Sequence, residues 1–485
     1  MLESLKNLNS YEAFKYFKEM NQIPRGSGNE KAVSDWLVAF AKKHNLEVIQ
    51  DEALNVIIKK PGTKGYENAP TVILQGHMDM VCEKNLDTVH DFEKDPIKFI
   101  VDGDFLRADG TTLGADDGIA VAFCLAILAS DDIPHPPLEV LITTEEETGM
   151  GGAIAVDPKN LSGRYLINID SEEEGKLLVS CAGGVRELIK LPIKWEDAPY
   201  DYVTYLVKIR GLKGGHSGME INKYRGNSNK LMARFLNDLE SAIDFKVASL
   251  NGGAKMNAIP REFDAVILVK DENKVALEEK VKEWNAIFKN ELQAQDPDVS
   301  LTFEEHERVT KVFSDETASK AIMTLLIIPN GIQTMSMAIE GLVESSTNIG
   351  VVTTEEDKIV FESALRSSVK TLKYEIAERG KAIAKLVGAE IEFLSDYPEW
   401  QYNPDSKLRE ICLKVYKDMY GKDAQIDAIH AGLECGLLGD KFNGQLDMIS
   451  MGPNLYDVHT PDEHLSISSA ERMWNYLIEV LKEIK

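Results

Sequence analysis

The sequence is poor in cysteine, and its cysteines form neither a metal-binding pattern nor a disulfide pattern. Their number is odd, no two of them form a CxxC pair, and two lie in apolar surroundings. These features exclude a disulfide framework and favour reduced, buried thiols of the kind found in a cytosol. The residues are Cys82, Cys124, Cys181, Cys412 and Cys435.

The sequence also lacks long apolar runs and an excess of positive charge. The longest apolar run, Ala120 to Ala129, has ten residues, about half of what a membrane span needs. Residues 1–20 alternate charged and apolar positions at helical spacing, which predicts a surface helix rather than a signal peptide. With 54 basic and 80 acidic residues the net charge is −26, which repels nucleic acid and anionic membranes but attracts cations. We therefore expect a soluble cytoplasmic protein with no nucleic-acid or membrane partner.

The chain begins with an α/β pattern. Its 485 residues exceed one ordinary core, so at least two domains are expected. From residue 10 to about 186, short apolar runs alternate with helical patterns, and the runs read NVIIKK, TVILQG, LEVLITT and RYLINID. Polar residues follow these runs directly, at the carboxyl ends of strands where ligands bind in open sheets.

The middle of the chain has a different pattern. From about residue 187 the order is strand, helix, strand, strand, helix, strand, and a similar second pass follows. Two α+β units in tandem would produce this order. After about residue 397 the α/β pattern returns. The sequence thus predicts one domain made of residues 1–186 and 397–485, interrupted by an insertion of residues 187–396.

Histidine and aspartate follow one apolar strand in the segment LQGHMDMV. His77 and Asp79 lie two apart, so their side chains point to the same face of the strand. A metal-bound imidazole commonly donates its other ring proton to a carboxylate. Asp79 fits that role, although a histidine and an aspartate at this spacing more often form an ordinary hydrogen-bonded pair.

Further candidate ligands follow other elements. Asp116 and Asp117 begin a buried helix, where carboxylates also serve as caps. Three glutamates, residues 145–147, follow an apolar strand, as in a solvated turn, but adjacent carboxylates can also divide their roles between metal and water. Asp170 and His459 each follow a further strand. Because one sheet can bring all these positions together, the set predicts a site for zinc, manganese or cobalt.

Several strings together resemble the M20 metallopeptidase family, and within it the aminoacyl-histidine dipeptidase subgroup. In chain order they are GHMDMV, TTLGADDGIAVA, TTEEETGMGGA, NIDSEE, GGHSG, MNAIP and DVHTPDEH, and they cover nearly the whole chain. The resemblance implies two divalent metal ions, with zinc favoured over cobalt or manganese. It implies that His77 and Asp170 bind one ion, that Glu147 and His459 bind the other, and that Asp116 bridges both.

The same resemblance assigns the glutamates that precede Gly149. Alignment on this glycine makes Glu146 the general base and Glu147 the ligand, whereas a shift by one residue would make Glu145 the base. It also implies a cis peptide bond between Asp116 and Asp117. Asp79 and Glu146 are thus the predicted catalytic residues.

The family architecture is an α/β, zinc-peptidase-like catalytic domain with a mixed sheet, interrupted by an inserted α+β lid. In this subgroup the lid has two ferredoxin-like halves. By resemblance, His216 in GGHSG stabilises negative charge on the scissile carbonyl, and Asn257 in MNAIP contacts the substrate backbone. Arg366 in ALRSS binds the substrate carboxylate, with a surface salt bridge as the alternative.

The function implied is hydrolysis of dipeptides, especially Xaa-His dipeptides including β-alanyl-histidine, with Glu146 as base. A tripeptidase, a carboxypeptidase or an N-acyl amino acid deacylase remains an alternative, because the metal motifs of these enzymes are shared. A catalytically silent peptide-binding protein would have lost a ligand or the base, and no such position is lost here. The partners implied are a small peptide and a second copy bound through the lid.

Two groups of residues have no assigned role. His430 and Glu434 have the spacing of neighbours on one helix face, which indicates either a pocket wall or a packing pair. The remaining histidines lie in charged or turn-like segments and are expected at the surface. They are His44, His90, His135, His306 and His464.

Overall fold

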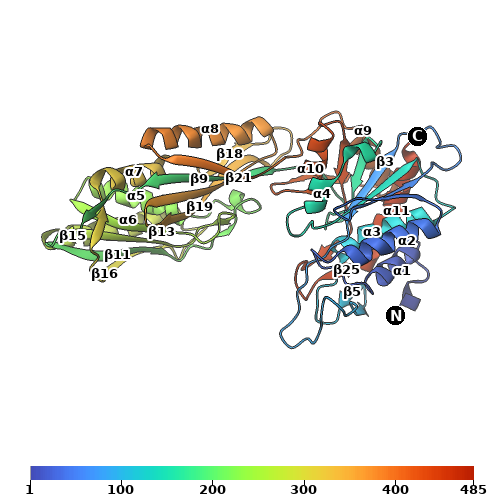
Figure 1. Ribbon diagram of the computed structural model, residues 1–485, viewed down its shortest axis with the longest axis horizontal. Coiled ribbons are helices and arrows are strands. Elements are labelled where there is room, and N and C mark those ends of the chain that lie inside the picture. The colour runs from blue at the N-terminus through green and yellow to red at the C-terminus, as the bar shows by residue number, and fades with distance from the viewer. Residues whose placement is uncertain (1) are drawn as a thin grey trace. The chain divides into compact units, whose positions relative to one another are not determined.

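The computed structural model describes residues 2–485, so Met1, the start of the expected N-terminal helix, lies outside it. The described chain forms two compact units, each shown in Figure 1. Unit 1 comprises the described residues up to Ser180 together with Trp400–Ala428 and Leu433–Lys485. Unit 2 comprises Cys181–Glu399 and the short segment Ile429–Gly432. Within residues 2–485, no helix has the length and apolar character needed to cross a membrane.

Unit 1 is built on an eight-stranded mixed sheet with the strand order β1-β2-β6-β3-β7-β23-β8-β22. The neighbours β6, β3, β7 and β23 run parallel, and β1 and β2 pair antiparallel at one side. Every residue of β3 and β6 is buried, as expected for parallel strands covered on both faces. The strands are β1 (Glu47–Gln50), β2 (Val56–Lys60), β3 (Val72–His77), β6 (Leu138–Thr143), β7 (Tyr165–Asn168), β8 (Lys176–Cys181), β22 (Gln425–Ile429) and β23 (Asp447–Ser450).

The helices of unit 1 cover this sheet. Helix α3 is apolar on nearly all sides and almost wholly buried, whereas α1 is amphipathic and packs its Phe14, Phe17 and Met20 face beside α3. The expected N-terminal helix therefore begins only at Tyr11 and has one buried face. The helices are α1 (Tyr11–Met20), α2 (Lys31–Lys43), α3 (Ala115–Ala129), α4 (Gly151–Ala155), α9 (Lys407–Tyr420), α10 (Glu434–Lys441), α11 (Ile467–Glu483) and the 3-10 turns η1 (Leu2–Leu5) and η2 (Pro158–Asn160). A small sheet is formed by β4 (Phe99–Asp102), β5 (Phe105–Ala108), β24 (Leu455–Tyr456) and β25 (His464–Ser466).

Unit 2 is built on an antiparallel sheet with the strand order β16-β11-β15-β13-β19-β20-β9-β21. The additional strand β18 pairs with β19 outside this order. Its strands are β9 (Gly183–Pro192), β11 (Tyr202–Arg210), β13 (Phe245–Gly252), β15 (Phe263–Lys270), β16 (Ser300–Glu305), β18 (Gly331–Met335), β19 (Val343–Thr354), β20 (Lys358–Ser367) and β21 (Glu390–Tyr397). Two short ribbons pair β10 (Trp195–Asp197) with β17 (Lys311–Phe313) and β12 (Gly215–His216) with β14 (Ala258–Ile259). The helical elements are α5 (Ser228–Glu240), α6 (Lys274–Glu291), α7 (Asp315–Ile327), α8 (Lys370–Val387), η3 (Ile221–Lys223) and η4 (Asp271–Asn273).

The unit 2 sheet consists of two ferredoxin-like halves, as the resemblance implies, but the tandem order expected from the sequence is wrong. The first half runs β11-α5-β13-β15-α6-β16, with its strands in the spatial order fourth, first, third, second. The second half has the same order in β9-α7-β19-β20-α8-β21. The first half is inserted between β9 and α7 of the second, so the halves are nested rather than consecutive. They join edge to edge where Gly252 of β13 pairs with Val352 of β19.

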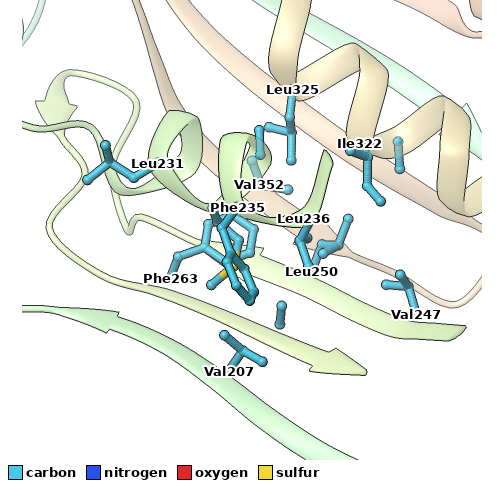
Figure 2. Packing of buried hydrophobic residues seen from close by; sticks show 14 of the residues in the cluster. Val207, Leu231, Phe235, Leu236, Val247, Leu250, Phe263, Ile322, Leu325 and Val352 are labelled. Carbon is cyan, nitrogen blue, oxygen red and sulfur yellow. The ribbon is translucent and has the colours of Figure 1, made fainter. Parts of the chain in front are cut away.

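One apolar core extends through both halves of unit 2. Figure 2 shows Phe235 and Leu236 of α5 packed between sheet residues such as Phe263 and the α7 residue Leu325. These four side chains are at most 1% exposed. Because the helices of both halves share this core, unit 2 is expected to fold as one body.

Four of the described cysteines are buried, and Cys82 is exposed. No disulfide joins the described residues, in agreement with the sequence.

Candidate metal centre

All five predicted metal ligands lie in unit 1, at the ends of its elements. His77 is the last residue of β3, and Asp170 follows β7 by two residues. Glu147 lies in the loop after β6, and Asp116 lies in the first turn of α3. His459 comes from the loop between β24 and β25. The parallel strands β3, β6 and β7 deliver their carboxyl ends to one edge of the sheet, which is where an α/β sheet places ligands.

Asp116 lies between the two histidines. Its Oδ1 is 3.1 Å from Nε2 of His77, and its Oδ2 is 3.1 Å from Nε2 of His459. The same His77 nitrogen is 3.6 Å from Asp170 Oδ1, and the His459 nitrogen is 3.0 Å from Glu147 Oε2. Two groups of three potential ligands therefore share one carboxylate, and the ligand atoms of each group lie within 4.8 Å of one another.

The carboxylates hold positive charge on both histidines. Burial alone would lower the pKa of His77, but the charge of Asp170 and the hydrogen bond to Asp116 outweigh it and raise the pKa well above its usual value. Hydrogen bonds to Asp116 and Glu147 raise the pKa of His459 to about 11. Burial raises the pKa of Asp170 to about 6. Each imidazolium thus occupies a position that favours a cation.

The donor set fits two divalent metal ions. Three carboxylates and two imidazoles form an oxygen and nitrogen set of the kind that zinc, manganese and cobalt accept. In addition, Oε1 of Glu147 is buried and has no hydrogen-bond partner among the described residues. A buried carboxylate oxygen without a partner is costly unless something else binds it.

Asp79 contacts both His77 and the loop that carries Glu146 and Glu147. It is fully buried, and its Oδ1 lies 3.3 Å from Nδ1 of His77. The backbone amides of Glu146 and Glu147 donate to its two carboxylate oxygens at 3.2 and 3.3 Å, and the Ser27 hydroxyl donates at 2.7 Å. One carboxylate therefore orients both the imidazole of β3 and the glutamate loop after β6.

The three glutamates of this loop have different environments. Glu145 is exposed and its φ is 51°, whereas Glu146 and Glu147 are partly buried and form a further potential ligand group with His77. Burial raises the pKa of Glu146 to about 9. Glu146 therefore lies at the centre, and the exposed Glu145 does not belong to any of these ligand groups.

The turn at the start of α3 has the expected cis peptide bond between Asp116 and Asp117. Asp117 is buried and accepts the backbone amide of His77 at 3.2 Å, so it binds β3 rather than joining the ligand groups. The N-cap residue of α3 is Gly114 rather than either of the two aspartates.

The sequence reasoning missed two buried charged residues that hold this turn. Glu463 is 2% exposed and accepts the backbone amides of residues 113–115 at 2.7–3.1 Å. Arg25 is 1% exposed and donates to the backbone carbonyls of Met78 at 2.9 Å and of residue 114 at 2.5 Å. Glu463 belongs to the DVHTPDEH string and could have been found there, but Arg25 is a lone arginine without any sequence signal.

The predicted substrate-binding residues all belong to unit 2. Arg366 is 9% exposed and donates to the Tyr397 hydroxyl at 2.9 Å, so the surface-salt-bridge alternative does not fit its burial. Burial and then the nearby Arg366 charge lower the pKa of His216. His216 and Asn257 line a cavity of about 550 Å³.

Two minor expectations were wrong. His430 and Glu434 do not share a helix face. His430 follows the strand β22 and belongs to unit 2, whereas Glu434 is the first residue of α10 in unit 1. His430 instead pairs its Nε2 with the Ser346 hydroxyl at 2.7 Å. His135 is fully buried rather than exposed, and its Nδ1 pairs with the carbonyl of Pro136 at 2.7 Å.

The chain is similar to known peptidases in sequence and in structure. Residues 73–483 match the sequence profile of Peptidase family M20/M25/M40. The cytosol non-specific dipeptidase of Escherichia coli (strain K12) is 38% identical over 483 residues, which cover 100% of this chain and 99% of the relative. The crystal structure of aminoacylhistidine dipeptidase from Vibrio alginolyticus matches with a TM-score of 0.95 and 39% identity, over 99% of this chain and 98% of that one. The aminopeptidase PepT from Bacillus cereus ATCC 10987 has a TM-score of 0.56 at 16% identity, covering 98% of this chain and 99% of that one, and shares the fold alone.

Proposed function

The chain belongs to peptidase family M20/M25/M40, and on that premise we propose that it is a cytoplasmic dipeptidase with a dinuclear metal centre. Two full-length relatives, one similar in sequence and one in structure, are dipeptidases by name at 38% and 39% identity. The observation that carries the proposal is the position of Asp116, whose two oxygens each contact a different histidine at 3.1 Å. A carboxylate shared in this way is what a bridging ligand requires.

The proposed ligands divide into two sets. His77 and Asp170 hold one ion, Glu147 and His459 hold the other, and Asp116 binds both. We propose zinc, with cobalt or manganese as alternatives. Two such ions, when bound, lower the pKa of a shared water and polarise the scissile carbonyl.

Glu146 is the proposed proton carrier. It lies in the loop that Asp79 fixes, next to the ligand Glu147, and within the group that includes His77. Its carboxylate takes the proton of the attacking water and delivers it to the nitrogen of the departing amine. Asp79 lies 3.3 Å from Nδ1 of His77, and Nε2 on the other side of the ring faces Asp116.

We propose that unit 2 serves as the lid and binds the substrate. The proposed catalytic domain comprises residues 1–186 and 397–485, and the proposed lid and dimerisation domain comprises residues 187–396. The buried guanidinium of Arg366 suits the substrate carboxylate. His216 suits the developing oxyanion, and Asn257, which lines the same cavity, suits the peptide backbone.

The proposed substrates are Xaa-His dipeptides, including β-alanyl-histidine, with a broader range among other dipeptides. The test is hydrolysis of matched dipeptides, tripeptides and N-acyl amino acids by the full chain loaded with zinc, cobalt or manganese. We expect metal-dependent cleavage of dipeptides to dominate. Faster cleavage of tripeptides or N-acyl amino acids would replace the proposal by another activity of the family. Binding of peptides without any metal-dependent hydrolysis would indicate a silent binding protein.

A further inference from the structure

Four polar side chains form a buried, hydrogen-bonded layer near the proposed metal centre. Gln75 of β3, Thr143 of β6, Asn168 of β7 and Glu434 of α10 are each 0% exposed. All four belong to unit 1. Polar side chains buried this completely need hydrogen-bond partners, and these four find them mainly in one another.

Glu434 is the shared acceptor of this layer. Its Oε2 accepts from Gln75 Nε2 at 2.5 Å and from Thr143 Oγ1 at 2.9 Å. The Oε1 of Gln75 in turn accepts from Asn168 Nδ2 at 2.6 Å. The first residue of α10 thus connects three neighbouring strands that are far apart in sequence.

Two members of the layer each lie two residues before a proposed ligand. Gln75 precedes His77 by two residues within β3, so the two share one face of that strand. Asn168 is the last residue of β7 and precedes Asp170 by two residues. Oδ1 of Asn168 also accepts the backbone amide of Asp170 at 3.4 Å. The hydrogen bonds of the layer therefore fix the separation of the strand ends that carry His77 and Asp170.

Glu147 and His459, the proposed ligands of the second ion, are held differently. The backbone amide of Glu147 donates to Asp79, and His459 lies on a separate loop between β24 and β25. Neither residue follows a member of the polar layer by two positions. The hydrogen bonds of the layer thus affect the positions of His77 and Asp170 more directly than those of Glu147 and His459.

We propose that Glu434 is a positioning residue that acts through Gln75 and Asn168 to set the affinity of the ion held by His77 and Asp170. The inference rests on the proposed dinuclear function. Removing the acceptor would leave the Gln75 amide without its short hydrogen bond and free the two strand ends to shift. Loss of such an outer hydrogen bond typically weakens metal binding by about 10–100-fold.

The test is calorimetric zinc titration of the full chain after chelator treatment. The wild type is expected to bind two zinc ions, and Glu434→Ala to bind one of them about 10–100-fold more weakly. Glu434→Gln keeps an acceptor oxygen and is expected to restore both sites. Glu139→Ala is the matched control, because Glu139 is 3% exposed on β6 at the opposite end and accepts the amides of Ser162 and Gly163. It should bind two zinc ions with wild-type affinity.

Two variants that each lack a ligand of one metal ion identify which ion Glu434 affects. Asp170→Asn leaves the ion on Glu147 and His459, and Glu434→Ala added to it should change that affinity little. His459→Gln leaves the ion on His77 and Asp170, and Glu434→Ala should weaken it by about 10–100-fold. If Glu434→Ala does not fold, Asn168→Ala removes the next link of the layer and should show the same selectivity.

Other outcomes separate the two proposals. Wild-type affinity at both sites in Glu434→Ala, equal weakening of both, or failure of Glu434→Gln to restore binding would each overturn the role of Glu434. A wild-type chain that does not bind two zinc ions would instead overturn the dinuclear centre itself.

Discussion

Asp79 lies 3.3 Å from Nδ1 of His77, and the same carboxylate accepts the backbone amides of both Glu146 and Glu147. A single buried side chain therefore couples the orientation of a proposed metal ligand to that of the proposed base. The sequence pairs Asp79 with His77 through their spacing alone. Its contact with the glutamate loop depends on β3 and β6 being parallel neighbours, which the structure shows.

Asp79→Asn should weaken both zinc binding and catalysis. Asparagine has the same shape, but its amide would point an N–H toward one of the present donors. We expect zinc affinity to fall by about 10–100-fold and dipeptide turnover to fall with it. Zinc titration and kcat measurements check this. Ser27→Ala, which removes only the hydroxyl that donates to Asp79 at 2.7 Å, should have a much smaller effect. Unchanged zinc affinity in Asp79→Asn would show that this carboxylate does not support His77.

Glu146→Gln should bind two zinc ions but lose turnover. Glutamine keeps the size of the side chain and cannot carry the proton, so kcat should fall by about 10²–10⁴-fold. The matched control is Glu145→Gln, since Glu145 is the exposed neighbour in the same loop. It should remain close to the wild type. If Glu145→Gln were the inactive variant instead, the assignment would have to shift by one residue.

The clustering of the candidate metal ligands could be predicted because most of them lie at or after the ends of apolar strands. His77 and Asp170 come directly after segments that read as strands in any α/β protein, and parallel strands place such positions at one edge. The division of the ligands between two ions came from resemblance alone. The contacts of Asp116 with both histidines fit this division.

Other features depend on partners distant in the sequence. The i, i+4 spacing of His430 and Glu434 suggested one helix, yet His430 follows the end of β22 and a bend separates it from α10. Spacing alone cannot distinguish these cases. The strand β9 pairs with β20 and β21, which lie far along the chain, so the nesting of the two halves leaves no local signal. His135 is buried with its Nδ1 paired to the Pro136 carbonyl, a contact that its polarity alone does not predict.

The metal-free protein should lose stability as pH rises, through His459. Hydrogen bonds to Asp116 and Glu147 raise its pKa from 6.5 to about 11. Stabilisation from a raised pKa is fully present below the unfolded value and is lost as pH rises through the folded value. The difference in melting temperature between the wild type and His459→Gln should therefore shrink from pH 7 toward pH 11. The effect is small because half of the side chain is exposed.

This pH dependence should disappear when zinc is present, because a metal-bound imidazole is already neutral. Thermal unfolding of both variants with chelator and with zinc provides the comparison. A constant difference between the two variants across this pH range in chelator would contradict the pairing of protonated His459 with Asp116.

Truncating the unit 2 core should destabilise the whole of that unit. Phe235 is fully buried between the sheet and the helices of both halves (Figure 2), and Phe235→Ala should cost about 3–5 kcal/mol of unfolding free energy. Val275→Ala on α6, where the side chain is 65% exposed, is the matched control and should change little. Denaturant unfolding followed by tryptophan fluorescence measures both. Loss of stability in only one half would show that the halves do not share one core.

Arg366→Ala should raise KM selectively for dipeptides that carry a free carboxylate. A hydrogen bond to a charged group contributes about 1.5–3 kcal/mol, which corresponds to roughly 10–150-fold in KM. Dipeptide amides lack the negative charge, so wild type should bind them weakly and the variant should bind them no worse. Tyr397→Phe removes the hydroxyl that Arg366 contacts at 2.9 Å but keeps the guanidinium, and only a several-fold effect is expected. An equal loss on both substrate classes would show that Arg366 stabilises unit 2 and does not bind the substrate carboxylate.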